Sequence, residues 1–559
     1  MSSRVRSGPR ACNSIGQVQY EVGTAGRAPA HVDRGGKVTV TVEPAGRAPE
    51  KGLKTGALGL ISSVVIGIAS TAPAYSLAAT LGFVVVAIGV QAPIVAILAF
   101  VPMFFISIAF QQMNKADPDC GATFTWSTRA FTPRIGWMGG WGCIAADIIV
   151  MASLAQIAGQ YVFDLFNTSS IGNTANSVWV LLVGIAWIVF MTWICYVGIE
   201  VSANFQKALL GIELTMLTVL SVWALVRVGI GSAPAGHIAP SWAWFDPFKV
   251  KHFSDFVVGL ADMLFIYWGW DTALNLNEET DNAQITPGKA GVISTFFLLG
   301  IYALVIFSVQ SFAGIGTHGI GLGNTNHAND VLSILGPAIF GHSTFASILD
   351  HLLLLMVLSS AAASTQTTIL PTARTVLSMS VHKALPDMFA KMHKRFLTPT
   401  IATVSFGLVS IVLYVVMNSL SAGHVISDSV DALGVMIAFY YGLTGWACVW
   451  YYRKSLTQSV RNFFVLGVMP LLGAIILYFI LGWSFWYYWN PANSYTILRV
   501  FGHTFGGTFV LDVGTLLIGL ILMFTMNAFR PAFFRGETLT RDSPTLVTED
   551  YGAVSGEVH

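Results

Sequence analysis

Apolar runs long enough to cross a lipid bilayer recur along most of the chain. A helix needs about 20 apolar residues to span a hydrocarbon layer of about 30 Å, and twelve stretches meet this length. The predicted spans are 57–80, 83–110, 135–163, 177–198, 205–229, 256–277, 290–315, 346–378, 400–419, 431–452, 464–486 and 509–530. The pattern predicts an all-α polytopic membrane protein with about twelve transmembrane helices.

The two ends of the chain are polar and differ from the apolar part between them. Residues 1–54 are rich in Gly, Arg and Pro and have no apolar period, so they lack the hydrophobic residues needed to build a core. No apolar segment follows their basic start closely enough to form a secretory signal. We expect residues 1–54 to be a disordered tail and residues 535–559 to be a second unstructured tail.

Composition supports the membrane class and excludes several functions. Of the 559 residues, 54% are hydrophobic and only 10% are charged, whereas globular domains carry about 25% charged residues. The net charge of +1 indicates no nucleic-acid partner. The five cysteines have no paired spacing, so we predict no metal site, disulfide framework or cofactor. No P-loop or nucleophile elbow is present, and we therefore predict a protein that is not an enzyme.

Basic residues in the connections predict how the chain is oriented in the membrane. All but four of the 29 Lys and Arg residues fall on the side that holds both termini, the exceptions being Arg227, Lys249, Lys251 and Arg499. Because cytoplasmic loops are enriched in Lys and Arg, we expect a plasma-membrane protein with both termini in the cytoplasm.

The first span contains a helix-breaking segment. Pro73 removes an amide donor and clashes with the preceding turn, so the helix should kink or break just before it. The amides and hydroxyls of Ser70, Thr71 and Ala72 would then lie at the positive end of a half-helix, which suits a carboxylate. The alternative is a proline kink that serves only helix packing.

The sixth span begins as an apolar helix and then places Gly269, Asp271 and Glu278 at membrane depth. A carboxylate there is costly unless it faces a cavity or a partner, so the segment indicates the broken helix of a transporter. Asp271 could respond to protonation, hold a cationic group, or cap the second half of the helix. For Glu279 we expect a charge at the membrane exit.

Together these segments resemble the amino acid–polyamine–organocation (APC) superfamily of permeases from about Gly56 to Lys454. The resemblance rests on G-x-x-S-T-x-P at 67–73, 119–126, 136–141, 269–271, 277–282, 359–363, 372–374, 384–386 and 398–399. It implies a LeuT-like core of two inverted five-helix repeats within 55–454. Two accessory helices would then occupy 455–534.

The resemblance also implies a substrate site at the two broken helices. Ser70, Thr71 and Ala72 would hold a substrate carboxylate. The carbonyls of Ile68, Phe265 and Trp268 would meet an amino group. The remaining implied site residues are Gly269, Trp270 and Asp271. Trp268, Trp270 and Tyr267 could form an aromatic wall or gate, or could be packing residues at the interface.

Glu213, in the fifth span, is the sharpest departure from the family pattern. In proton-coupled relatives a lysine commonly occupies this position between helices one, five and eight. Glu213 could carry a proton, help hold sodium with the hydroxyls of Ser359, Ser360 or Ser364, or make a structural hydrogen bond. Asp147, Asp262 and Asp350 are further carboxylates in or near apolar runs, and we consider them candidate pathway residues.

The predicted function is secondary active transport of amino acids by alternating access, with import coupled to H+ or Na+. A polyamine or amine transporter and an amino acid exchanger are alternatives. A transporter-like nutrient sensor is an alternative from a different class. The predicted partners are a small-molecule substrate and the lipid bilayer, and the sequence does not indicate the oligomeric state.

Overall fold

The computed structural model describes residues 31–32, 38–39 and 51–544, except 167, 173, 175, 342 and 422. The chain divides into two compact units, residues 1–49 and residues 50–559. In the first, β1 (His31–Val32) pairs antiparallel with β2 (Val38–Thr39). Most of the predicted tail 1–54 and residues 545–559 of the predicted second tail lie outside the described residues.

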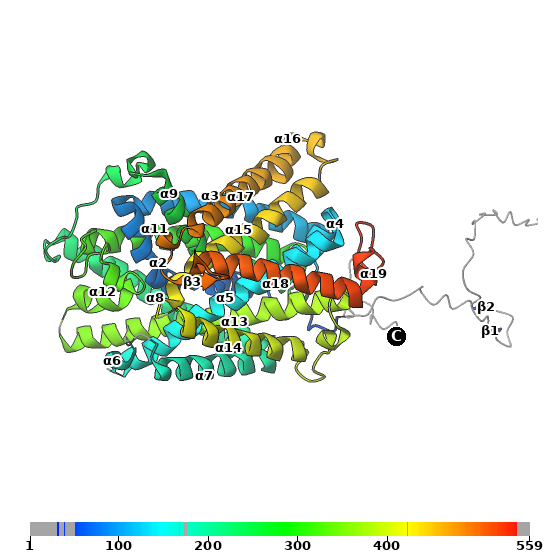
Figure 1. Ribbon diagram of the computed structural model, residues 1–559, viewed down its shortest axis with the longest axis horizontal. Helices are drawn as coiled ribbons and strands as arrows, with labels where there is room; N and C mark the ends of the chain where they lie inside the picture. The colour runs from blue at the N-terminus through cyan, green and yellow to red at the C-terminus, as the bar shows by residue number, and fades with distance from the viewer. Residues whose placement is uncertain are drawn as a thin grey trace, which may run out of the picture. The chain divides into compact units, whose positions relative to one another are not determined.

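Helices dominate the second unit (Figure 1). The α-helices are α1 (Leu60–Thr71), α2 (Pro73–Ile88), α3 (Ala92–Ala116), α4 (Thr123–Ala130), α5 (Pro133–Leu165), α6 (Ser169–Gly172), α7 (Val178–Val197), α8 (Ile199–Gly229), α9 (Phe253–Ile266), α10 (Thr272–Asn275), α11 (Thr286–Ala313), α12 (Val331–Phe340), α13 (Thr344–Val381), α14 (Thr400–Leu420), α15 (Val425–Tyr451), α16 (Val460–Asn462), α17 (Met469–Trp489), α18 (Gly507–Phe529) and α19 (Pro531–Phe534). A hairpin of β3 (Ile497–Val500) and β4 (His503–Gly506) precedes α18.

Short helical turns complete the connections. They are η1 (Gly89–Gln91), η2 (Trp242–Phe245), η3 (Pro247–Lys249), η4 (Asn277–Glu279), η5 (Thr325–His327), η6 (Asp387–Ala390), η7 (Leu456–Gln458), the π-helical η8 (Phe463–Val468) and η9 (Pro491–Asn493).

The predicted class of polytopic all-α membrane protein is confirmed. Among the described residues, ten helical segments are long and apolar enough to cross a membrane. One of them, Leu60–Ala116, contains both the first and second predicted spans, and the sixth predicted span is divided between α9 and α10. The count of twelve stays a prediction. The predicted start of the second span at residue 83 is wrong, because α2 continues to Ile88 and α3 begins at Ala92.

The helices differ in how much of their surface the rest of the protein covers. In the most apolar part of α5, 94% of the residues are buried, and α5 contacts α7, α13 and α15. In the corresponding part of α18 only 17% of the residues are buried, so the other apolar side chains of that part can face lipid. In Figure 1 the helices α7, α13, α14 and α18 run in roughly the same direction. The breaks in the first and sixth spans are therefore held among long, well-packed helices.

Both predicted tails are shorter than expected where the structure describes them. Lys51 and Leu53 are buried, and so is Leu539 near the other end. The Thr538 hydroxyl donates to the carbonyl of His382. The sequence did not predict these contacts. Each segment is polar overall, and only a few of its side chains and backbone groups contact the bundle.

Candidate functional site

The first span breaks at Ala72, as the proline predicts. The helix α1 ends at Thr71 and α2 begins at Pro73, and Ala72 between them has a left-handed backbone with φ of 45°. Ala72 is fully buried, so the break lies inside the protein rather than at a surface loop.

The free amides at this break are not the predicted ones. Ser70 and Thr71 belong to the last turn of α1, the negative end of that helix, and the Ala72 amide donates to Ala69 O. The amides at the positive start of α2 are those of Ala74 and Tyr75. Proline forms the first residue of α2, which moves the free donors two residues along the chain.

Both of these amides already have side-chain partners. The Ala74 amide donates to Glu213 Oε1 at 2.7 Å, and the Tyr75 amide donates to Ser360 Oγ at 3.2 Å. The Ser360 hydroxyl also donates to Glu213 Oε1 at 2.7 Å. A carboxylate of the protein itself therefore occupies the positive end of the half-helix, whereas the sequence predicted a substrate anion there, on Ser70, Thr71 and Ala72.

The remaining groups of the predicted cradle make internal contacts. The Ser70 hydroxyl lies 2.8 Å from Thr272 Oγ1, and the Thr71 hydroxyl donates to Ile68 O at 2.7 Å. The Ser364 hydroxyl donates to Ser70 O at 3.2 Å. These bonds tie the end of α1 to α10 and α13.

The sixth span also breaks where the sequence predicts. The helix α9 ends at Ile266, α10 begins at Thr272, and Gly269 between them has φ of 116°. A Cβ on Gly269 would lie 2.8 Å from Ser70 Oγ and 2.9 Å from Ser70 O. Only glycine permits both this backbone conformation and this close approach, so the two breaks meet at Gly269 and Ser70.

Asp271 is held by two tyrosines of α15. Tyr441 donates to Asp271 Oδ1 at 2.8 Å and Tyr440 donates to Oδ2 at 3.0 Å. The Asp271 side chain makes no capping hydrogen bond to α10, so the capping interpretation is wrong. A carboxylate with both oxygens fixed by neutral donors keeps its negative charge available for a cation.

The predicted aromatic residues are buried around this carboxylate. Trp268 Nε1 donates to the hydroxyl of Tyr440. Trp270 packs edge-on against Phe110 at 5.2 Å between ring centroids. Tyr267 packs edge-on against Tyr302 at 5.1 Å. Phe265, which was predicted for its carbonyl, packs edge-on against Tyr75 at 6.1 Å. The rings enclose the junction of the two breaks, and their role as a substrate wall or gate stays a prediction.

Of the backbone carbonyls predicted to meet an amino group, that of Ile68 has room for one more donor. Ile68 O accepts the Thr71 hydroxyl, and a carbonyl oxygen carries two lone pairs. Phe265 O already accepts the amides of Tyr267 and Trp268, so both of its lone pairs are engaged.

Glu213 lies between the first, fifth and eighth spans, as the resemblance implies. Its Oε1 accepts the two bonds described above, whereas Oε2 is buried and has no hydrogen-bond partner within the part of the chain that the structure describes. Of the three candidate serines, only Ser360 contacts it, because the Ser359 hydroxyl donates to Met356 O and the Ser364 hydroxyl to Ser70 O. The geometry leaves one carboxyl oxygen free to carry a proton.

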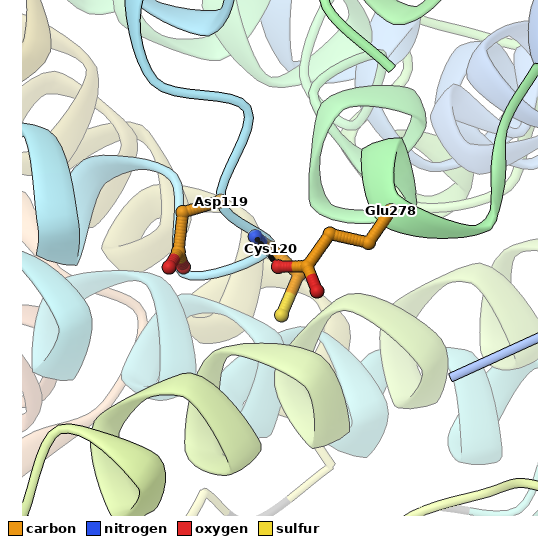
Figure 2. Close-up of side chains that lie close together, drawn as sticks. All are labelled: Asp119, Cys120 and Glu278. Carbon is orange, nitrogen blue, oxygen red and sulfur yellow. Dashed lines mark hydrogen bonds between the residues drawn. The ribbon is translucent and has the colours of Figure 1, made fainter. Parts of the chain in front are cut away.

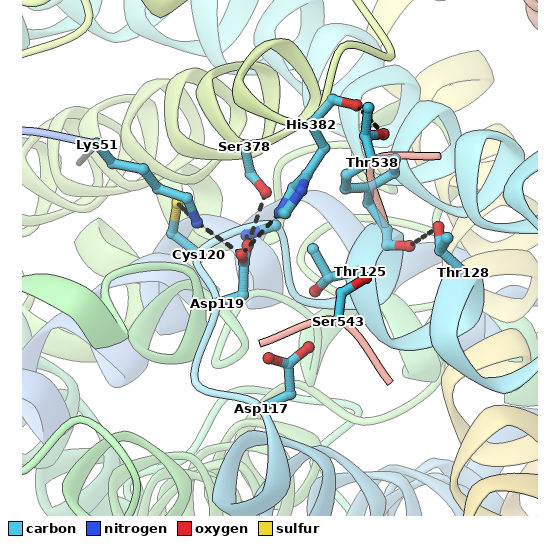
Figure 3. Close-up of polar contacts among 12 residues, drawn as sticks. Lys51, Asp117, Asp119, Cys120, Thr125, Thr128, Ser378, His382, Thr538 and Ser543 are labelled. Carbon is cyan, nitrogen blue, oxygen red and sulfur yellow. Dashed lines mark hydrogen bonds and ion pairs between the residues drawn. The ribbon is translucent and has the colours of Figure 1, made fainter. Parts of the chain in front are cut away.

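A second group of charged residues is buried beside the segment that precedes α1, where α3 and α13 end. Lys51 Nζ is 2.7 Å from Asp119 Oδ2 and 2.6 Å from Glu278 Oε1. Ser378 and His382 approach Asp119 from α13 and its end, and Figure 3 shows them converging on its carboxylate. This group, the Lys51 cluster, joins the segment before α1 to three distant parts of the fold.

The charges in the Lys51 cluster stabilise one another. Burial alone would raise the pKa of Asp119, but the Lys51 ammonium and the bond with His382 hold that pKa well below its usual range. Burial alone would likewise lower the pKa of Lys51, but Asp119, Cys120 and Glu278 raise it well above its usual value. Both groups are therefore charged at neutral pH.

Three metal-ligand side chains come together in this cluster. One ligand atom each of Asp119, Cys120 and Glu278 lies within 4.8 Å of the others (Figure 2). Lys51 Nζ also lies 3.7 Å from Cys120 Sγ, so an ammonium already sits among them. Burial and the Glu278 carboxylate raise the pKa of the Cys120 thiol well above its usual value. The residues present fit an internal ion pair better than a metal site.

Glu279 is not an exposed charge at the membrane exit. Its carboxylate accepts two hydrogen bonds from Arg374, at 2.9 and 3.0 Å, and both side chains are buried. The prediction is wrong because Arg374 lies 95 positions further along the chain, and α13 places its side chain in the core beside Glu279.

Sequence reasoning missed Lys51, Tyr440 and Tyr441. The tyrosine pair inside the apolar tenth span was an available signal, since neighbouring hydroxyls at membrane depth need partners. Lys51 gave no signal, because a lone lysine in a polar segment resembles any tail residue. Among the described contacts of Asp271 and Glu213, no Lys or Arg neutralises either carboxylate.

Most of the chain is similar in sequence to known transporters. The family model described as amino acid permease matches residues 56–511. The low-affinity putrescine importer PlaP of Escherichia coli (strain K12) is 19% identical over 429 residues, covering 75% of this chain and 86% of that protein. The methylthioribose transporter of Bacillus subtilis (strain 168) is 22% identical over 359 residues, covering 61% and 70%.

A third relative carries amino acids. The branched-chain amino acid permease BcaP of Lactococcus lactis subsp. cremoris (strain MG1363) is 22% identical over 234 residues, covering 40% of this chain and 48% of that protein. The named relatives are transporters or permeases and not enzymes.

Proposed function

The chain belongs to the amino acid permease family of the APC superfamily, and on that premise we propose that it is a secondary active transporter of small substrates that bear an ammonium group. Its family moves amino acids, amines or related compounds across membranes. The proposal places the protein in the plasma membrane with both termini in the cytoplasm, as the distribution of Lys and Arg predicts.

The meeting of the two helix breaks is the observation that carries this proposal. Gly269 approaches Ser70 so closely that no side chain fits between them. Broken helices expose carbonyl groups that can replace the hydration of a cation. Asp271 adds a full negative charge beside the break, and its oxygens are fixed by Tyr440 and Tyr441. An ammonium group complements this junction.

Two candidate substrates, an amino acid and an amine, differ in whether they also bear a carboxylate. An amino acid was first expected because free amides at the first break would bind its carboxylate. The amides of Ala74 and Tyr75 are engaged by Glu213 and Ser360, and that observation favours an amine without a carboxylate. An amino acid would have to bind through other groups of the break or displace Glu213.

Glu213 is the proposed coupling residue, with a proton as the coupling ion. Its Oε1 holds the start of α2, so the charge on Glu213 acts directly on the half-helix beside the substrate junction. Sodium would need several converging oxygens, yet of the predicted serines only Ser360 contacts this carboxyl group. A proton on Oε2, which has no hydrogen-bond partner among the described residues, would neutralise the carboxylate without requiring several converging oxygens.

Uptake into proteoliposomes tests the function. Labelled amino acids, putrescine and other amines are supplied with a pH gradient, with a sodium gradient, and with neither. We expect saturable accumulation of an ammonium-bearing substrate that a pH gradient drives and a sodium gradient does not. Absence of saturable uptake for every compound would overturn the proposed function, and drive by sodium alone would overturn the assignment of the coupling ion.

A further inference from the structure

A second acidic site lies at the opposite end of the bundle from the Lys51 cluster. A cavity of about 360 Å³ opens where α2 ends and where α9 and α15 begin, beside the segment that follows α17. Three carboxylates and four aromatic rings are among its lining: Asp255, Asp262, Asp431, Phe83, Tyr487, Tyr488 and Tyr495. We name it the acidic cavity.

Asp262 is the side chain that points to a missing ligand. It lines the cavity, is only 3% exposed, and has no hydrogen-bond or ion-pair partner among the described residues. Asp431 is 9% exposed and lies close enough to Asp262 for the two carboxylates to interact electrostatically. The Tyr488 hydroxyl is a hydrogen-bond partner of Asp431. Asp262, a buried carboxylate without such a partner, is unfavourable unless a proton or a cation neutralises it.

No positively charged side chain of the described lining neutralises these carboxylates. The described lining of the cavity contains no Lys or Arg. The His424 ring stacks on Tyr495 at 5.9 Å and interacts electrostatically with Asp428, which does not line the cavity. The carboxylates of the described lining can therefore be neutralised by a shared proton or by a cation from outside the chain.

The lining suits an organic cation better than a metal ion. Among the described residues, the carboxylates of this cavity do not form a group of three ligand atoms within 4.8 Å, as a compact metal site would. Aromatic faces attract alkylammonium groups, and the Tyr495 ring packs on Phe83 at 5.4 Å. A cavity of this volume is in the range of small-ligand pockets.

The acidic cavity lies along the helix that leads to the second break. Asp262 is four residues before the end of α9 at Ile266, which is roughly 6 Å along a helix at 1.5 Å per residue. If the termini are cytoplasmic, the cavity opens to the outside.

We propose that the acidic cavity binds an alkylammonium ion that carries no carboxylate, with a diamine bound most tightly. Two ammonium groups match the pair Asp262 and Asp431, and the alkyl chain lies against the tyrosine rings. A substrate carboxylate would be repelled by three acidic side chains. That this ligand is also the transported substrate rests on the proposed function, whereas its binding does not.

Protection of an introduced thiol tests the site directly. Ala492→Cys places a reporter in the lining at an exposed position, and Trp242→Cys, whose side chain is 90% exposed outside the cavity, is the matched control. Intact cells expressing the full chain are treated with a membrane-impermeant maleimide in the presence or absence of putrescine. The four described native cysteines are buried.

We expect putrescine to slow labelling of Ala492→Cys at least five-fold and to leave Trp242→Cys unaffected. Gamma-aminobutyrate and the uncharged diol of the same length should not protect. Adding Asp262→Asn or Asp431→Asn to the reporter should abolish protection, whereas Asp246→Asn, an exposed carboxylate on the same side, should preserve it. The unprotected labelling rate shows that each variant reaches the surface, and two separate carboxylate variants guard against one failing to fold.

Three outcomes would overturn the proposal: no protection by putrescine, equal protection by gamma-aminobutyrate, or protection that survives both Asp262→Asn and Asp431→Asn. Failure of the proposed function is distinct, because it is an absence of uptake in proteoliposomes. If putrescine protects the thiol in a manner that depends on Asp262 but no uptake is found, the binding site is supported and only its role in transport is overturned.

Discussion

The carboxyl group of Glu213 accepts a hydrogen bond of 2.7 Å from the backbone amide of Ala74, 139 positions earlier in the chain. Ala74 lies in the first turn of α2, directly after the break at Ala72. The positive end of a helix attracts a negative charge and loses that attraction when the charge is neutralised. Protonation of Glu213 therefore weakens one of the contacts that position α2 beside the substrate junction.

Glu213→Gln should uncouple transport from the pH gradient. Glutamine keeps a carbonyl oxygen for the Ala74 amide and mimics the protonated carboxyl group. We expect substrate exchange between loaded proteoliposomes within about two-fold of the native rate, with accumulation driven by a pH gradient reduced at least ten-fold. If both pH and sodium gradients drive the variant as well as the native protein, Glu213 is structural.

The two serines beside Glu213 provide a matched comparison. Ser360→Ala removes a donor to Glu213 and an acceptor for the Tyr75 amide. Ser359→Ala removes only a hydroxyl that donates to Met356 O in its own helix. The pH dependence of uptake should shift in Ser360→Ala and not in Ser359→Ala, and equal shifts in both would contradict a specific role for Ser360.

Gly269→Ala should block the close approach of the two breaks. The added Cβ would meet Ser70 at 2.8 to 2.9 Å, and alanine disfavours a backbone with φ of 116°. Overpacking of this kind costs about 1–3 kcal/mol, so we expect at least a ten-fold loss of uptake with normal membrane expression. Gly300→Ala, where a Cβ meets nothing within 4 Å, is the control and should transport normally.

The helix-one break can be tested by filling it. Ala72 is fully buried with a left-handed backbone, so Ala72→Leu places a bulky side chain where none fits. Thr71→Val removes the hydroxyl that donates to Ile68 O. We expect both to weaken substrate binding in a radioligand assay, Ala72→Leu at least a hundred-fold. Unaltered uptake kinetics in both variants would move the substrate site elsewhere.

Lys51→Met should strongly destabilise the protein, since it leaves Asp119 and Glu278 buried without their cation. Breaking a buried ion pair by removing one partner costs about 3–5 kcal/mol. Lys383→Met is the control, because Lys383 makes an exposed pair with Asp387 and such pairs contribute about 0–1 kcal/mol. Melting temperatures of both variants in detergent check the difference, and equal small changes would contradict it.

The pH dependence of that effect follows from the two pKa shifts. The lowered pKa of Asp119 stabilises the fold above the unfolded value of about 3.9 and is lost as the pH falls through the folded value. The raised pKa of Lys51 stabilises the fold below about 10.4 and is lost only above the folded value. Between pH 5 and 9, as a rough window set by these values, this pair contributes a constant stabilisation. Burial raises the pKa of Glu278 to about 7, so the change in melting temperature that this cluster causes in that window should come from Glu278 and should be absent in Glu278→Gln.

Local pattern was sufficient for the existence of most spans and for both breaks, although not for the boundary between the first two spans. A run of about 20 apolar residues is a signal contained within one segment, and Pro73 and Gly269 act on their own backbones. The exact donors at the first break were misplaced because a proline in the first turn of α2 moves the free amides onto Ala74 and Tyr75.

Contacts between distant segments could not be obtained from the sequence alone. Asp271 was recognised as a functional carboxylate, but its partners Tyr440 and Tyr441 lie 169 and 170 positions away. Lys51 was assigned to a tail because nothing near it is apolar, although its partner Glu278 lies 227 positions away. Such pairs are fixed by tertiary packing and leave no periodic signal in either segment.

Asp271→Asn tests the charge at the substrate junction without changing its shape. Asparagine keeps an oxygen for one tyrosine hydroxyl but removes the negative charge that complements an ammonium group. Because a charged hydrogen bond contributes about 1.5–3 kcal/mol, we expect the dissociation constant for the transported substrate to rise roughly ten-fold to hundred-fold. Tyr441→Phe, which removes one donor to Asp271 and the hydroxyl near the Gly269 amide, should have a smaller effect in the same direction. If Asp271→Asn binds an ammonium substrate as tightly as the native protein, the charge is structural and the ammonium group is held by carbonyls alone.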